Sequence, residues 1–505
     1  MIQGGLPFWL LRDANMTVRS RNGSFLTHVD KWFSVLLPRI RPLLYHNGGP
    51  IISVQVENEY GSFGCDPHYM ELIRDMIRKH LGPQIVLFTV DPADDQSLSC
   101  GHVDGAYATI DFGSQVTDVV PMFDLQRKYD SHAPLINSEF YVGWYDLWGG
   151  DHVPSGPAAN EASARVLDHM LAMNASVNIY MFAGGTSFGF TTGALIGDGD
   201  EYQPITTSYD FGAPVSEAGD VTDKYKALQN IVRKYMPVAK TEDALTNLTK
   251  TNYGRVQMDC PVADIFEFSD RYSLVTESKY PLTFEAVSQA NGFLLYSTRV
   301  IGAPSSTQRL QVAGLHDRGI VFVNKKFQGI LSRSQKVDEV FVTATEGDEL
   351  QILVENQGRI CYGTQIQEFK GITGAVTLSG TRLKNWKTAT IPINDNLSGK
   401  LAAFECKNER VRIGTPAFYR SKFNLTKVVG DTFLMLDNWS KGVAILNGFN
   451  LGRYWTTAGP QRTLYVPMHR MREVNELILF ELESTCNSSQ PDKCTAAFID
   501  HHILQ

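Results

Sequence analysis

The stretch GGPIISVQVENEYG, residues 48–61, decides the fold of this 505-residue chain. Its apolar run at 51–56 has the length and the β-branched residues of a buried strand, and it ends abruptly at Glu57 and Glu59. A charged residue at the end of a buried strand is costly unless it is paired or catalytic. We therefore expect a parallel strand whose carboxyl end carries acidic side chains into a site.

Four further apolar runs predict strands of the same kind. They lie at residues 85–90, 106–112, 135–140 and 177–182. Helical patterns separate them, and a spacing of about 25–40 residues per unit is typical of a (β/α) barrel. A closed barrel of this kind has eight strands, whereas only five precede Pro237. The predicted fold of residues 1–237 is therefore α/β, an incomplete (β/α)8 TIM barrel with about five strands.

Two helices of this region have clear boundaries. Asp66-Pro67 fits the cap and first residue of a helix that Gly82-Pro83 ends, and a second helix runs near 222–236. Apolar residues at helical spacing predict the buried face of each. The faces comprise Tyr69, Leu72, Ile73, Met76 and Ile77 in the first helix, and Tyr225, Leu228, Ile231, Val232 and Tyr235 in the second.

The second half of the chain lacks helical periodicity and shows short strands and turns, which predict all-β structure. A faint repeat supports two related domains. Strands at 320–324 and 443–448 each lead into a hairpin, and similar strands follow at 349–353 and 476–479. Asn447-Gly448 favours a tight type I′ turn.

This pattern predicts two β-sandwich domains of jelly-roll type after the incomplete barrel. We place the first at residues 270–385 and the second at 400–500. Residues 238–269 are expected to connect the barrel with the first sandwich.

The composition excludes several function classes. Lys and Arg number 46 and Asp and Glu 54, so the net charge of −8 argues against nucleic acid or an anionic membrane as the partner. No apolar run approaches the ~18 residues of a transmembrane helix. The first residues lack the basic and apolar regions of a signal peptide, so we expect neither a membrane span nor a signal peptide in this chain.

The seven cysteines indicate disulfides rather than metal binding. None forms a CxxC pair and none has a histidine at zinc-site spacing, so no metal is expected. Cys486 and Cys494 bracket a polar loop that fits a small disulfide, with two free thiols as the alternative.

Eight N-glycosylation triplets indicate a secretory or lysosomal glycoprotein, which conflicts with the missing signal peptide. They begin at Asn15, Asn22, Asn174, Asn247, Asn396, Asn424, Asn438 and Asn487. Asn174 lies in an apolar stretch, and we expect it to be unmodified.

Two predicted strands end in glutamates. Alternation along a strand places Glu57 and Glu59 on one side of the first, and the strand at 135–140 ends at Glu139. Two strand-end glutamates are the minimum for glycoside hydrolysis, since one must hold a proton and the other must stay ionised. The alternative is that these glutamates are structural ion-pair partners.

Aromatic residues near both strand ends suit the apolar face of a pyranose sugar. They are Tyr60, Tyr141, Trp144, Trp148, Tyr180 and Tyr209. An ordinary aromatic core is the alternative.

The string at 48–61 resembles the signature of family thirty-five glycoside hydrolases. Further matching strings lie at 136–141, 180–186, 208–210, 216–220 and 447–455. Within that family, the chain resembles the animal lysosomal β-galactosidases along its whole length.

The resemblance implies a retaining hydrolase that releases terminal non-reducing β-D-galactose from glycolipids, glycoproteins or glycosaminoglycans without a cofactor or metal. It implies galactose-binding-like folds for the two sandwiches and a lysosomal or secreted location, and it allows a homodimer.

The resemblance also assigns roles to residues. Glu59 would be the acid/base on the fourth barrel strand and Glu139 the nucleophile on the seventh. Asn58 would bond to the sugar 2-OH, with Glu57 as a neighbouring candidate for substrate binding. Trp144, Tyr180 and Tyr209 would line the galactose pocket, whereas Phe211 stands where a tyrosine is usual. The same resemblance pairs Cys65 with Cys100 and Cys486 with Cys494.

In the implied mechanism, Glu139 attacks the anomeric carbon while Glu59 protonates the leaving oxygen. Retaining enzymes hold the two carboxyl groups ~5–5.5 Å apart. The negative charge of Glu139 should then raise the pKa of Glu59.

The match begins inside the family's catalytic domain, after the third barrel strand. We therefore expect a truncated gene model or isoform that lacks three strands and one sugar-binding loop. The alternative function is a catalytically inactive remnant, which either binds carbohydrate through its sandwiches or does nothing alone. A related retaining glycosidase with another sugar preference is a third hypothesis.

Overall fold

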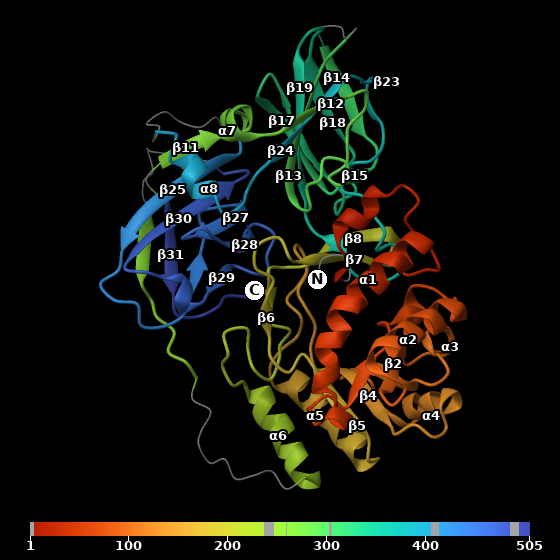
Figure 1. The fold of residues 1–505 in the computed structure, drawn as a ribbon. Helices are drawn as coiled ribbons and strands as arrows, with labels where there is room; N and C mark the ends of the chain where they lie inside the picture. The colour runs from red at the N-terminus through yellow and green to blue at the C-terminus, as the bar shows by residue number, and fades with distance from the viewer. Residues whose placement is uncertain are drawn as a thin grey trace.

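The computed structural model describes residues 5–236, 247–258, 260–301, 306–405, 414–484 and 494–504. The chain forms three parts (Figure 1). A layer of parallel strands and helices, red to yellow in the figure, is followed by a green β-sandwich and a blue one. The order of fold types along the chain is the predicted one.

The first part contains a five-stranded sheet in the order β1-β2-β3-β4-β5, with every neighbouring pair parallel. The strands are β1 (Ser53–Gln55), β2 (Val86–Pro92), β3 (Tyr107–Gly113), β4 (Ile136–Tyr141) and β5 (Ser176–Tyr180). All five predicted strands are confirmed. The sheet curls into part of a barrel, and β1 and β5 are its edges.

Helices alternate with these strands and bury apolar side chains against the sheet, as parallel strands require. They are α1 (Gly23–Ile40), α2 (Pro67–Leu81), α3 (Asp95–Gly101), α4 (Val120–Tyr129), α5 (Pro157–Ala172) and α6 (Asp223–Tyr235). Short 3₁₀ helices are η2 (Phe8–Arg12), η3 (Arg41–Leu43), η4 (Tyr45–Asn47), η5 (Tyr60–Ser62), η6 (Asp198–Asp200) and, near the C-terminus, η7 (Met468–Arg470).

The cap of α2 is as predicted, and α6 lies within the predicted range 222–236. The Asp66 carboxylate accepts hydrogen bonds from the first turn of α2, and Thr222 caps α6. Two members of the predicted buried faces are wrong. Leu72 is exposed because it lies about 100° around the helix from Ile73. Tyr235 is exposed too, and its hydroxyl donates to Asp168.

Two small β-ribbons follow β5 and extend the first part toward the sandwiches. β6 (Gly185–Thr186) pairs with β9 (Ser208–Tyr209), and β7 (Gly193–Gly197) pairs with β8 (Glu201–Pro204). β7 also pairs in parallel with β20 (Arg359–Ile360), which belongs to the first sandwich region. The first two parts of the molecule therefore share a sheet.

The first sandwich packs a six-stranded sheet against a four-stranded one, in the orders β12-β24-β13-β19-β16-β17 and β18-β14-β22-β23. The strands of the larger sheet are β12 (Val275–Ser278), β13 (Gly292–Arg299), β16 (Arg318–Val323), β17 (Lys326–Ser332), β19 (Glu349–Asn356) and β24 (Trp386–Ile391). Those of the smaller sheet are β14 (Ser306–Val312), β18 (Glu339–Ala344), β22 (Val376–Leu378) and β23 (Thr381–Arg382), and β15 (Leu315–His316) pairs with β21 (Gly371–Ile372). Because β24 completes the larger sheet, the first sandwich extends beyond the predicted boundary at 385.

The second sandwich has sheets in the orders β11-β25-β30-β27-β28 and β10-β31-β26-β29. The strands are β10 (Gly254–Gln257), β11 (Cys260–Asp264), β25 (Ala417–Asn424), β26 (Thr432–Met435), β27 (Lys441–Leu446), β28 (Phe449–Trp455), β29 (Thr463–Val466), β30 (Val474–Glu481) and β31 (Thr495–Ile499). Two further helices are α7 (Ile265–Tyr272) and α8 (Leu397–Leu401). The prediction that 238–269 only connects domains is wrong, because β10 and β11 hydrogen-bond with strands of this sandwich.

The predicted internal repeat is confirmed. β16 forms a hairpin with β17 and pairs with β19 on its other side, and β27 does the same with β28 and β30. Each hairpin contains one register shift. In each turn two consecutive residues have positive φ, Asn324-Lys325 and Asn447-Gly448, which is the geometry of a type I′ turn.

The cysteine predictions are tested in part. Cys65 and Cys100 form a disulfide that ties the segment after β1 to α3. Cys494 is disulfide-bonded, but Cys486 lies outside the described residues, so that pairing stays a prediction.

Asn174 is exposed in the turn before β5, so the apolar surroundings expected for it were wrong. In the described part of the chain, no helix has the length and apolarity needed to cross a membrane.

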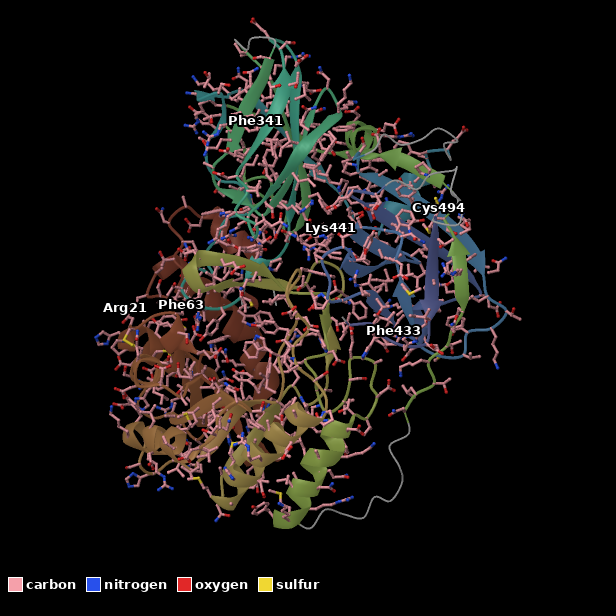
Figure 2. All side chains as sticks on the ribbon, turned by 180° about the vertical axis from the view of Figure 1, so that it is seen from behind. Arg21, Phe63, Phe341, Phe433, Lys441 and Cys494 are labelled. Atoms are coloured by element: carbon pink, nitrogen blue, oxygen red, sulfur yellow. A yellow bond between two sulfur atoms is a disulfide. The ribbon has the colours of Figure 1, made fainter. Side chains whose placement is uncertain are left out.

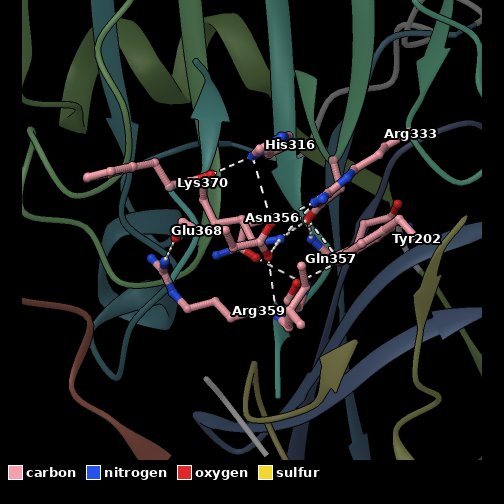
Figure 3. Close-up of polar contacts among 12 residues, drawn as sticks. Tyr202, His316, Arg333, Asn356, Gln357, Arg359, Glu368 and Lys370 are labelled. Atoms are coloured by element: carbon pink, nitrogen blue, oxygen red, sulfur yellow. Dashed lines mark hydrogen bonds and ion pairs between the residues drawn. The ribbon is translucent and has the colours of Figure 1, made fainter. Parts of the chain in front are cut away.

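Buried polar contacts join the three parts, an ion pair between the two sandwiches and a tyrosine hydrogen bond between the first part and the first sandwich. Figure 2 shows Lys441 between the two sandwiches, where its ammonium lies 3.0 Å from the Glu355 carboxylate. Figure 3 shows a second group, here called the junction cluster, where the first part meets the first sandwich. It consists of Tyr202, Asp317, Arg333, Glu368 and Lys370.

Candidate active site

The carboxyl ends of the parallel strands open into a cavity of about 1060 Å³. Its lining combines polar side chains from the strand ends with apolar residues of α1 and α2, such as Phe33 and Ile73. Every predicted substrate-binding and catalytic residue lines this cavity. They are Glu57, Asn58, Glu59, Glu139, Trp144, Tyr180 and Tyr209.

The turn after β1 is not an extended strand end. β1 stops at Gln55, and Glu57 and Glu59 have φ values of 60° and 47°. The prediction that simple alternation places both glutamates is therefore wrong. Left-handed backbone at non-glycine residues costs about 1–2 kcal/mol and is found where a side chain must be aimed. The Gln55 amide stabilises the turn by donating to the Glu57 carbonyl and to the Asn58 side chain, both at 2.8 Å.

Glu57 has structural partners for both carboxylate oxygens. Arg19 lies 2.8 Å away as an ion pair, and the Tyr69 hydroxyl donates at 2.5 Å. The Asn58 backbone N–H donates to the same carboxylate at 2.9 Å. The structure thus gives Glu57 the ion pair that the alternative interpretation foresaw.

Glu59 lies in a different environment, although only two residues separate it from Glu57. Burial and, second, the nearby charge of Glu139 raise the pKa of Glu59 to about 7. The more distant Arg19 and the Asn58 amide, which donates at 3.2 Å, oppose this rise. The predicted direction is confirmed, and burial contributes more than the neighbouring charge.

Glu139 lies on β4 beside a bulge. The register between β3 and β4 shifts so that Ser138 has no paired residue and Glu139 pairs with Asp111. Bulges of this kind re-aim side chains next to active sites. The Tyr141 hydroxyl donates to the Glu139 carboxylate at 3.0 Å, and burial raises the pKa of Glu139. Among the described residues, no Lys or Arg forms an ion pair with Glu59 or Glu139.

Aromatic rings, here called the aromatic wall, also line the cavity, and they are those of Tyr141, Trp144, Tyr180 and Tyr209. Trp144 is 39% exposed and contacts Tyr141 edge to face at 5.2 Å. The hydroxyls of Tyr180 and Tyr209 lie 3.0 Å apart, and Phe211 stacks on Tyr209 at 5.5 Å.

Two aromatic residues that the sequence associated with a sugar face belong to the core instead. Tyr60 packs on Tyr69 at 4.9 Å, and Trp148 packs against Trp455 of the second sandwich at 6.5 Å. The aromatic-core alternative is correct for these two.

Several cavity residues were not foreseen. Arg19 and Tyr145 carry no local signal, and Cys361 and Tyr362 come from the loop after β20, far along the chain. The Tyr362 hydroxyl donates to Ser62 at 2.6 Å, which fixes this loop over the turn after β1. Asp111 could have been found, because it is the one acidic residue inside the apolar run at 106–112.

This arrangement can perform acid–base chemistry beside a nucleophile. The buried Glu59 carboxyl holds a proton near neutral pH, and the negative charge of Glu139 acts on it. Aromatic rings line the same cavity as these two carboxyls.

Comparison with known proteins agrees with this chemistry. The model of Glycosyl hydrolases family 35 matches residues 1–235. The first all-beta domain of beta-galactosidase matches residues 281–393, and its galactose-binding domain matches residues 416–475. The three matches follow the three parts of the fold.

Curated relatives match almost the whole chain. Beta-galactosidase of Bos taurus is 40% identical and that of Homo sapiens is 40% identical. The Beta-galactosidase-1-like protein of Mus musculus is 42% identical. Each alignment covers 99% of this chain and, respectively, 79%, 76% and 76% of the relative.

Proposed function

Because the chain belongs to family 35 of the glycosyl hydrolases, we propose that it hydrolyses terminal non-reducing β-D-galactose residues of glycoconjugates, with retention of anomeric configuration. One observation carries the proposal: Glu59, with a pKa of about 7, and Glu139 share a cavity in which no cation of the described residues pairs with either.

In the proposed first step, the Glu139 carboxylate attacks the anomeric carbon of galactose. The bond to the leaving oxygen breaks, and Glu59 donates its proton to that oxygen. The product is a galactosyl ester on Glu139. Water then gives its proton to Glu59 and attacks the anomeric carbon, which breaks the ester and restores both carboxyls.

The remaining residues of the site support this chemistry. In the proposed complex, Asn58, which Gln55 holds, bonds to the sugar 2-OH, and the rings of Trp144, Tyr180 and Tyr209, which line the cavity, contact the sugar. The Arg19–Glu57 pair holds the turn that carries Asn58, because Arg19 also donates to the Asn58 carbonyl at 2.6 Å.

We also propose that the protein works in a lysosomal or secretory compartment. The Cys65–Cys100 disulfide and the eight glycosylation triplets both fit an oxidising, glycosylating pathway. The glycan classes that it cleaves and a homodimeric state stay predictions.

The test is hydrolysis of a chromogenic β-galactoside by the purified chain, with the released anomer followed by NMR. We expect β-galactose as the first product and a fall of activity above about pH 7, because Glu59 then loses its proton. Release of α-galactose would contradict the retaining mechanism. Cleavage of a β-glucoside alone would favour another sugar preference, and galactose binding without hydrolysis would favour the inactive alternative.

A further inference from the structure

Asp111 is a third buried carboxyl in the cavity, and the mechanism above does not use it. It lies near the end of β3, it is only 4% exposed, and it lines the cavity beside Glu59 and Glu139. Its Oδ2 atom is buried and has no hydrogen-bond partner. A carboxylate left in this state costs several kcal/mol, whereas a protonated carboxyl avoids most of that cost.

The sheet register places Asp111 directly beside the proposed nucleophile. After the bulge at Ser138, Asp111 pairs with Glu139. Paired residues of neighbouring parallel strands point to the same face, and such strands lie about 4.8 Å apart. Two ionised carboxylates at that separation in a buried site repel strongly, so one of them must hold a proton.

The groups around Asp111 supply no compensating charge. Glu59 faces it from the turn after β1, Asp91 from β2, and Glu139 and Tyr141 from β4. Among the described residues, no Lys or Arg forms an ion pair with it, and the strongest charges acting on it are all negative. Burial and then the charges of Glu59, Glu139 and Asp91 raise the pKa of Asp111 to about 9, and the Tyr141 hydroxyl lowers it slightly.

We propose that Asp111 is a positioning residue that stays protonated beside Glu139 throughout the reaction. It leaves the single negative charge of this pair on the nucleophile, and its O–H is available as a neutral donor within the site. The role in catalysis rests on the proposed function, whereas the protonation state of Asp111 does not. Asp111 takes no part in bond making, so the atoms and protons of the two steps are unchanged.

Infrared difference spectroscopy tests the protonation state without activity. The full chain is labelled with [13C]aspartate, which separates this signal from buried glutamates such as Glu217. At pH 8, where Asp91 has lost most of its proton, we expect a carbonyl band of a protonated aspartate that disappears in Asp111→Asn and persists in Asp104→Asn. Asp104 is an exposed aspartate before the same strand. An identical protonated band in wild type and Asp111→Asn would overturn the proposal.

A titration of the wild type gives the same answer if Asp111→Asn does not fold. Asp91, whose pKa is raised to about 7, loses its band first. We expect an aspartate band that remains at about pH 8, because Asp111 then still holds its proton. Loss of every protonated aspartate band by pH 8 would overturn the proposal.

Kinetics test the positioning role. Asp111→Asn keeps a neutral donor of the same shape, so we expect kcat within about threefold of wild type and an unchanged basic limb of the pH profile. Asp111→Ala removes the donor, and we expect kcat to fall about tenfold or more with little change in KM. A large loss in Asp111→Asn would mean that an ionised Asp111 is needed and would overturn the proposal. If the wild type cleaves no galactoside but the protonated band is present, the proposed function fails and the protonation of Asp111 stands.

Discussion

The junction cluster and the cavity both bury several carboxyl groups, but the junction cluster pairs all of its carboxylates with cations, whereas the cavity pairs only Glu57, with Arg19. In the junction, Lys370 lies 2.9 Å from Asp317 and 2.6 Å from Glu368, and Arg333 lies 3.0 Å and 2.7 Å from the same two groups (Figure 3). In the cavity, Glu59, Glu139 and Asp111 have no such cation among the described residues.

The pKa values of the two regions differ accordingly. Burial raises the pKa of Asp317, but Lys370 and Arg333 outweigh it and hold that pKa below its usual value. Burial meets no comparable opposition at Glu59, whose pKa rises to about 7. A buried carboxyl that is paired with cations stays ionised, whereas an unpaired one has a raised pKa and can hold a proton for chemistry. The comparison therefore separates structural carboxyls from chemical ones.

The largest expected effect is in the cavity. Glu139→Gln removes the nucleophile but keeps the shape, so we expect kcat for a β-galactoside to fall by about 10³-fold or more. Thermal unfolding should change little. The control is Glu161→Gln, an exposed glutamate on α5, which should keep full activity. Equal activity in both variants would remove Glu139 from the mechanism.

The next effect lies in the junction. Lys370→Met leaves Asp317 and Glu368 with one cation instead of two. We therefore expect the free energy of unfolding of the first sandwich, measured by urea denaturation, to fall by about 3–5 kcal/mol. The pH profile of the remaining activity should not move. Lys226→Met removes an exposed ion pair with Asp223 and should cost less than about 1 kcal/mol. Similar losses of unfolding free energy in Lys370→Met and Lys226→Met would contradict the structural role of the junction cluster.

Glu59 makes stability depend on pH in a predictable direction. Its pKa is about 7 in the folded chain and near 4.5 when unfolded, so ionisation favours the unfolded state. The contribution of protonated Glu59 to the free energy of unfolding is fully present below about pH 4.5. It is lost as the pH rises through 7, and the total loss is about 3 kcal/mol. Urea denaturation across this range should show a loss that is larger by about this amount in wild type than in Glu59→Gln, because other buried carboxyls such as Asp91 contribute equally to both proteins. Parallel curves for the two proteins would contradict the raised pKa.

The smallest effect concerns the aromatic wall. Tyr180→Phe removes one partner of the 3.0 Å bond to the Tyr209 hydroxyl, which costs about 1 kcal/mol or a fivefold loss in kcat/KM. The change should appear mainly in KM, because the carboxyls are untouched. Steady-state kinetics on the β-galactoside measure it. A loss as large as that of Glu139→Gln would place Tyr180 in the chemical step.

The fold could be predicted where local signals repeat. Five apolar runs identified the parallel strands, and the two I′ turns marked the matching hairpins of the sandwiches. The prediction that residues 238–269 are a connector was wrong because this range contains the short strands β10 and β11. These strands pair with β31 and β25, which lie more than 150 residues later in the chain. No local pattern reports such long-range pairing.

The site could be predicted only in outline. Strand ends and family resemblance selected Glu59 and Glu139, but the different roles of Glu57 and Glu59 depend on Arg19. That arginine lies 38 residues earlier in the chain, outside any regular element. The bulge that sets Asp111 beside Glu139 depends likewise on strand register, which the sequence does not show.

The most direct test of the account is to trap the covalent intermediate. A 2-deoxy-2-fluoro-β-galactoside with a good leaving group forms the ester with the nucleophile but slows its hydrolysis. After digestion, peptide mass spectrometry should find the fluorogalactosyl group on Glu139, in the strand Ile136–Tyr141. A label on Glu59 or Glu57, or turnover of the substrate with no ester at any carboxyl, would contradict the assignment of Glu139 as the nucleophile.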